Sequence, residues 1–120
     1  MDINQLIAQV KAHPEYRRVG MILTHVGVVR EFSRDGRNVS GVRLSVDRPR
    51  IEPIVAAEKQ TPGIVEILVE ITDQQELAVG DEIMAVVVAG DIRDNVLAVM
   101  ARTIDAIKQT VTQKAEHFIE

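Results

Sequence analysis

The sequence predicts an α+β domain with a mostly antiparallel sheet, with its elements in the order α-β-β-α-β-β-α. Three observations lead to this prediction. Apolar residues recur at helical spacing near both ends of the chain, whereas they alternate with polar residues in the middle. The length of 120 residues suits one compact domain over residues 1–120. Because 46% of the residues are hydrophobic but only 2% are aromatic, the core must consist of aliphatic side chains.

The first half of the chain predicts a helix followed by a hairpin. Residues 2–12 carry apolar side chains at helical spacing. Residues 20–29 are apolar and rich in β-branched side chains, and residues 39–46 alternate cleanly between apolar and polar. Both segments are therefore expected to be strands, and Asp35-Gly36 between them is a strong signal for a hairpin turn.

The second half predicts a short helix, two strands and the longest helix. Residues 51–59 have helical spacing, and residues 64–71 alternate as a strand. A loop over residues 74–80 leads to residues 82–89, which are nearly all apolar, as in a central strand covered on both faces. The last helix begins at Gly90-Asp91, and its apolar stripe extends to Val111. We expect the helices to pack against one face of the sheet.

The composition excludes several classes of protein. The chain contains no cysteine, which rules out disulfides and thiolate metal sites. Three scattered aromatic residues do not form a stacking platform for nucleic acid, and the net charge of -4 also argues against a general nucleic-acid binder. No apolar run approaches the length of a membrane span, and the N-terminus does not resemble a signal peptide. We expect a cytoplasmic protein that binds neither membranes nor nucleic acid.

The charges are unevenly distributed along the chain. Residues 30–50 hold six arginines against three acidic residues, whereas residues 52–105 hold eleven acidic residues against three basic ones. Arginine presents a planar fork that suits phosphate and carboxylate groups. The arginine-rich segment is therefore either a docking surface for a small anion or acidic partner, or a solvated hairpin whose arginines pair with the acidic remainder.

The histidines and lysines supply the remaining candidate groups. The three histidines lie far apart in the sequence, so no metal site is expected, and His25 inside a predicted strand is typical of a sheet-face histidine. On a helical projection, Lys114 and Arg93 fall on the apolar stripe of the last helix and Lys108 lies at its edge. Either the long stems cover apolar surface while the charges reach water, or a pocket near the helix end adapts a lysine for catalysis.

In three blocks the sequence resembles the large, catalytic subunit of molybdopterin synthase. Residues 20–30 (GMILTHVGVVR) resemble the first strand of that family, with Arg30 at the position of its arginine. Residues 75–83 (QELAVGDEI) resemble its G-E-L-x-x-G-D-E-I turn and strand, and residues 92–108 resemble its last long helix. The three blocks occur in the family's order, and the resemblance covers about residues 20–117.

The resemblance implies a sulfurtransferase of molybdenum cofactor biosynthesis. Such an enzyme adds two sulfurs to a cyclic pyranopterin monophosphate and takes them from a thiocarboxylate on the C-terminal Gly-Gly tail of a ubiquitin-like small subunit. Two large subunits form a homodimer, and no cofactor or metal is implied. Carried over by position, Arg30 and Arg93 would bind the substrate phosphate, and Lys108 would be a catalytic lysine. Lys114 is expected to be the second catalytic lysine, although it lies one residue before the position of the second family lysine.

A second hypothesis is a non-catalytic relative that acts as a dimeric binding or interaction protein. It is motivated by Ile92 and His25, which stand where the family has a histidine and a phenylalanine, and by Lys114, which lies one residue before the position of the second family lysine. A third hypothesis is a pterin- or phosphate-binding module that uses the arginine-rich segment.

Overall fold

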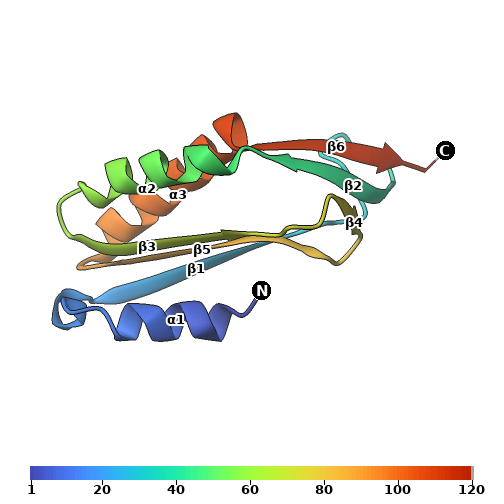
Figure 1. The fold of residues 1–120 in the computed structure, drawn as a ribbon. Coiled ribbons are helices and arrows are strands. Elements are labelled where there is room, and N and C mark those ends of the chain that lie inside the picture. The colour runs from blue at the N-terminus through green and yellow to red at the C-terminus, as the bar shows by residue number, and fades with distance from the viewer. Residues whose placement is uncertain (120) are drawn as a thin grey trace.

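The computed structural model describes residues 1–119 and contains two three-stranded antiparallel sheets (Figure 1). In the first sheet, β5 (Glu82–Gly90) lies between β1 (Met21–Val28) and β3 (Ile64–Ile71). In the second sheet, β2 (Val39–Val46) lies between the short β4 (Glu76–Ala78) and β6 (Thr112–Phe118). The second sheet extends beyond the first, so the molecule is elongated, with dimensions of 52 × 25 × 25 Å.

Three α-helices cover the first sheet, and two short 3₁₀ helices (Tyr16–Arg18 and Arg48–Arg50) join elements. Helices α2 (Ile51–Lys59) and α3 (Arg93–Thr110) lie on one face, whereas α1 (Ile3–Lys11) lies on the opposite face (Figure 1). The expectation that all helices share one face was therefore wrong for α1. Within the described part of the chain, every helix is too short or too polar to cross a membrane.

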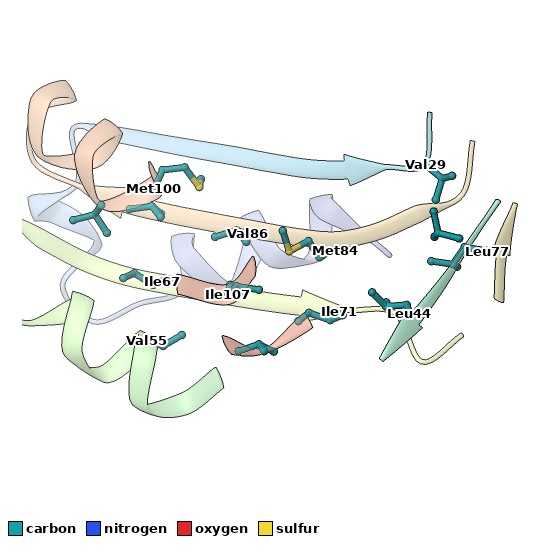
Figure 2. Packing of buried hydrophobic residues seen from close by; sticks show 14 of the residues in the cluster. Val29, Leu44, Val55, Ile67, Ile71, Leu77, Met84, Val86, Met100 and Ile107 are labelled. Carbon is teal, nitrogen blue, oxygen red and sulfur yellow. The ribbon is translucent and has the colours of Figure 1, made fainter. Parts of the chain in front are cut away.

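The arrangement on both faces follows from the apolar run of β5. Residues 84–90 are all buried, because alternate side chains of this strand face opposite layers of helices. Met84, Val86 and Val88 join the larger core cluster under α2 and α3 (Figure 2). The side chains between them, Ala85, Val87 and Ala89, pack with α1 in a smaller cluster. The prediction of a central strand covered on both faces is confirmed.

The structure also differs from the sequence prediction at two elements. The predicted loop over residues 74–80 contains the short strand β4, which pairs with β2. The last helix ends at Thr110, so Lys114 lies on β6 and not on a helical stripe. Thr110, Val111 and Thr112 are three consecutive β-branched residues, which disfavour helix and favour strand. Pairing of β6 with β2 then provides the hydrogen-bond partners of an extended chain.

Candidate functional site

A cleft of about 560 Å³ opens where the two sheets meet. Its wall combines residues from β1 and the loop that follows it, from β2 and β5, and from the end of α3 with β6. The lining residues are His25, Gly27, Val28, Val29, Arg30, Arg34, Val42, Leu44, Ile83, Met84, Lys108, Thr112, Lys114 and Glu116. This size is typical of a site for a small molecule, and the mixture of an apolar floor with a few charged groups is typical as well.

The charged groups of the cleft are mostly cations. Arg30, Arg34, Lys108 and Lys114 line it together with one acidic residue, Glu116. Among residues 1–119, none of the four cations forms an ion pair with a carboxylate. Like charges held close together without partners repel one another, so the cleft is electrostatically suited to an anionic ligand.

The turn at the end of α3 brings the two lysines to the same cleft. Lys108 lies in the last turn of the helix, where the helix dipole favours a cation. The chain then turns at Val111, which is buried, and continues as β6, where Lys114 pairs in register with Leu44 of β2. Lys108 at the end of a helix and Lys114 on a strand therefore line the same cleft, although they do not lie on one helix.

Backbone hydrogen bonds hold Arg30 at the end of β1. The amide of Val29 donates to the carbonyl oxygen of Asp81 at 2.9 Å, and the amide of Gly80 donates to the carbonyl oxygen of Val29 at 2.8 Å. Val29 itself is buried in the core. Val29, the residue immediately before Arg30, is therefore held in place by its backbone hydrogen bonds and by its buried side chain.

Arg34 enters the cleft from the turn between β1 and β2. The hydroxyl of Ser33 donates to the carboxylate of Asp35, and the amide of Arg37 donates to both side chains at 3.2 Å. These hydrogen bonds, with the one from Ser33 first, lower the pKa of the Asp35 carboxyl below its usual value. Gly36 adopts a φ of 86°, which side-chain-bearing residues avoid, so the chain does turn at Asp35-Gly36. The predicted hairpin is nevertheless wrong, because β1 pairs with β5 in one sheet and β2 pairs with β4 and β6 in the other, and only an isolated bridge between Phe32 and Asn38 closes the turn.

His25 also forms part of the cleft wall. The half-buried imidazole lies on β1, opposite Val86 of β5. Burial lowers its pKa below the usual value of 6.5, and the positive charge of Lys108 lowers it further. Its Nε2 atom is buried and has no hydrogen-bond partner among the described residues.

Arg93 does not belong to this cleft. It is exposed at the first position of α3, fifteen residues before Lys108, which corresponds to about 22 Å along the helix axis. The sequence-based expectation placed Arg93 on the apolar stripe of the helix, and the structure instead exposes its side chain. A single copy of the chain therefore brings together Arg30, Lys108 and Lys114, but not Arg93.

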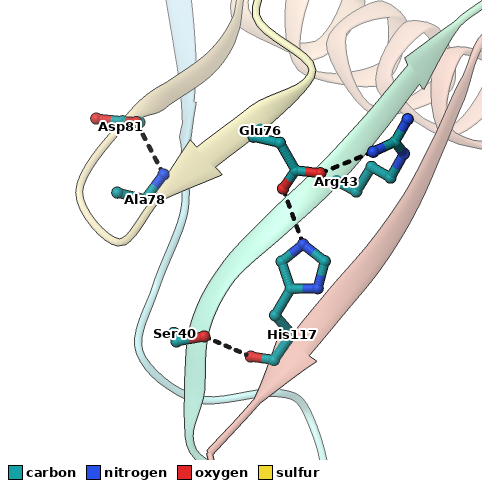
Figure 3. Close-up of polar contacts among 6 residues, drawn as sticks. All are labelled: Ser40, Arg43, Glu76, Ala78, Asp81 and His117. Carbon is teal, nitrogen blue, oxygen red and sulfur yellow. Dashed lines mark hydrogen bonds and ion pairs between the residues drawn. The ribbon is translucent and has the colours of Figure 1, made fainter.

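In the arginine-rich segment, residues 30–50, some arginines pair with acidic residues, and others have no such partner among residues 1–119 and are free to bind an anion in the cleft. Arg43 pairs with Glu76 (Figure 3), Arg48 with Asp73 and Arg50 with Asp47. Arg30 and Arg34 instead line the cleft. No motif in the sequence identifies Arg34 or Glu116 individually as a site residue. The density of arginines pointed to Arg34 only in general, and nothing in the sequence pointed to Glu116.

Comparisons with known proteins identify the family. The sequence model of the family described as MoaE protein matches residues 1–110. A search of curated protein sequences finds no match. Among solved structures, a molybdopterin biosynthesis MoaE protein from Burkholderia ambifaria is similar with a TM-score of 0.76 and 21% identity, covering 99% of this chain and 82% of that chain.

Two further solved structures share the fold. Molybdopterin synthase from Staphylococcus aureus has a TM-score of 0.72 at 18% identity, covering 88% of this chain and 84% of that chain. A complex of subunits 1 and 2 of molybdopterin-converting factor from Helicobacter pylori has a TM-score of 0.70 at 19% identity, covering 98% of this chain and 80% of that chain. At these identities the structures show the fold, and the family match over residues 1–110 shows the membership. The chain belongs to the MoaE protein family.

Proposed function

We propose that this chain acts in molybdenum cofactor biosynthesis as the large subunit of a molybdopterin synthase. In this role it transfers sulfur from a thiocarboxylate on a small subunit to a cyclic pyranopterin monophosphate. The observation that carries the proposal is the convergence of four cations without ion-pair partners among residues 1–119, two of them lysines, in one cleft of a protein of this family.

The charge of the cleft suits both proposed reactants. Each carries an anionic group, a phosphate on the pterin and a thiocarboxylate on the small-subunit tail. Arg30 and Arg34 offer planar guanidinium groups, which bind phosphate through paired hydrogen bonds. Lys108 and Lys114 offer point charges that stabilise negative charge developing on the thiocarboxylate carbonyl oxygen during transfer.

The proposed partner is a ubiquitin-like small subunit with a C-terminal Gly-Gly tail. Support comes from the Helicobacter pylori relative in fold, which was solved as a complex of two different subunits. A flexible tail of small residues suits an open cleft, because glycines pass close to a wall that larger side chains would contact.

The homodimer implied by the family resemblance remains a prediction, and Arg93 is its most direct probe. Because Arg93 lies far from the cleft of its own chain, it contributes to substrate binding only from a second copy. We expect light scattering to give about twice the chain mass of 13.3 kDa. A monomeric mass under assay conditions would exclude Arg93 from the site.

The function is tested by reconstituting the reaction. The protein is mixed with a thiocarboxylated small subunit and the pterin precursor, and formation of the dithiolene product is followed. We expect Lys108→Ala to reduce the rate by at least about a hundredfold, the usual cost of losing one group that stabilises developing charge. Lys11→Ala is the matched control, since Lys11 lies on α1 outside the cleft.

The hypothesis of a non-catalytic relative makes the opposite prediction. If the small subunit binds and no dithiolene forms, the synthase proposal is wrong and the binding protein remains. If Lys108→Ala abolishes a measurable transfer while Lys11→Ala does not, the non-catalytic hypothesis is wrong.

A further inference from the structure

One buried polar atom in the cleft wall has no hydrogen-bond partner among residues 1–119. It is Nε2 of His25, on the face of β1 that is turned toward α3. A Cβ placed on Gly27, two residues along the same face, would lie 3.6 Å from this atom. The imidazole edge therefore lies over a glycine at the cleft wall. Buried polar atoms normally have partners, so an unpaired one in the wall of a ligand-sized cleft is a candidate for a hydrogen bond to a ligand, once a small rotation of the imidazole exposes it.

The surroundings of His25 are positively charged. The neighbouring strand β5 contributes only apolar side chains to the cleft, Ile83 and Met84, and β2 contributes Val42 and Leu44. Lys108 approaches from α3, and the remaining charged groups of the cleft come from the loop after β1 and from β6: Arg30, Arg34, Lys114 and Glu116.

This environment keeps the imidazole neutral before an anion binds. Removal from water disfavours the charged form, and the ammonium group of Lys108 disfavours it further, so the pKa of His25 lies below its usual value of 6.5. An anion in the cleft would offset the positive field and would also offer an acceptor to a protonated Nε2. Both effects favour the imidazolium form, so the pKa of His25 must rise on binding.

We propose that His25 is a ligand-binding residue of the cleft, which takes up a proton when an oxyanion binds and then donates a hydrogen bond from Nε2 to it. This inference rests on the proposed function in one respect only, namely that the cleft accepts the phosphate of the substrate. By linkage, proton uptake and anion binding strengthen each other to the same degree. The affinity for an oxyanion therefore increases as the pH falls.

The test uses inorganic sulfate, which keeps its charge across the pH range in which histidine titrates. Sulfate is titrated into the whole protein at about pH 6 and about pH 8, and the imidazole signals are followed by NMR. We expect sulfate to raise the pKa of His25 and to bind about threefold to tenfold more tightly at the lower pH, since one pKa unit corresponds to a tenfold coupling. His13 and His117 are internal controls, because neither lines the cleft.

Two variants test whether the effect depends on protonation of His25 and on the charge of Lys108. His25→Gln retains a polar group that does not titrate, so it should bind sulfate with nearly the same affinity at both values of pH. Lys108→Gln removes the cation whose charge lowers the pKa of His25, so it should raise that pKa in the ligand-free protein toward its usual value. Wild-type NMR alone still tests the inference if either variant fails to fold.

The outcomes distinguish this inference from the proposed function. Sulfate binding that leaves the pKa of His25 unchanged, or a pH dependence that persists in His25→Gln, overturns the inference and leaves the synthase proposal intact. The absence of sulfate binding also overturns the inference. If sulfate binding and protonation of His25 are coupled but no dithiolene product forms, the inference about His25 stands and the proposed synthase function is wrong.

Discussion

Ile107 and Leu97 lie on the same helix and differ in what surrounds them. Ile107 is fully buried in the larger core cluster, on the side of α3 that packs against the first sheet, whereas 48% of the surface of Leu97 is exposed. A buried aliphatic side chain contributes through its transfer out of water and through close packing, and truncation removes both contributions. An exposed one contributes little, because its environment hardly changes on unfolding.

We therefore expect Ile107→Ala to lower the free energy of unfolding by about 2–5 kcal/mol. Leu97→Ala should change it by less than about 0.5 kcal/mol, because alanine is a good helix former at an exposed position. Urea unfolding followed by circular dichroism measures both variants. Similar losses in the two variants would contradict the packing of α3 on the first sheet.

At the scale of elements, Glu76 ties the three strands of the second sheet together. From β4, its carboxylate accepts a hydrogen bond from Arg43 of β2 and contacts Nε2 of His117 on β6, each at 2.9 Å (Figure 3). Hydrogen bonding from His117 first, and then from Arg43, lowers the pKa of Glu76 below its usual value of 4.5. Because β4 has only three residues, this contact adds to the little that holds the strand in place, namely its pairing with β2 and the buried side chain of Leu77.

The pH dependence of this contact follows from the direction of the shift. A carboxyl group whose pKa is lowered by folding stabilises the fold at any pH above its pKa in the unfolded chain. This contribution is lost as the pH falls through the lower pKa of the folded protein. We expect Glu76→Gln to melt about 1–3 °C below the wild type at neutral pH. This difference should begin to shrink as the pH falls below the usual value of 4.5 and should vanish once the pH is below the lowered pKa of Glu76. Melting curves across this pH range measure it. Glu70→Gln, an exposed change on β3, should show no such trend.

At the scale of the whole molecule, the cleft is a positive site on a protein with a net charge of -4. Four cations without ion pairs among the described residues repel one another in the ligand-free protein, so the cleft is held together at some cost to stability. Binding sites commonly carry such a cost, because the ligand supplies the missing charge.

We expect Arg34→Gln to raise the melting temperature of the ligand-free protein by about 1–3 °C and to weaken sulfate binding. The gain should fade at high salt, because salt screens the repulsion that the substitution relieves. Differential scanning calorimetry at low and high salt measures it. The control is Arg17→Gln, which removes an arginine paired with Glu15 and should not stabilise the protein. Destabilisation by Arg34→Gln would show that the cations of the cleft do not repel one another.

Much of the fold could be predicted from local patterns, and the cleft only in part. Alternation over residues 39–46 and 64–71 and the apolar run of β5 each identify a strand, because side-chain period reports which faces are buried. Nothing in the local pattern of residues 74–80 indicates β4, whose three residues become a strand only by pairing with β2. Arg30 and Lys108 were placed by resemblance, and the structure brings both to one cleft.

The sequence by itself determined the aliphatic core, the Asp35-Gly36 turn and the order of the main elements, because these depend on neighbours along the chain. Only the tertiary structure decided which charged groups meet. Pairing of β6 with β2 carries Lys114 to the cleft, the turn after β1 adds Arg34, and the length of α3 keeps Arg93 away from it. These placements depend on contacts between segments that are distant in sequence, and residue spacing along a single element does not contain that information.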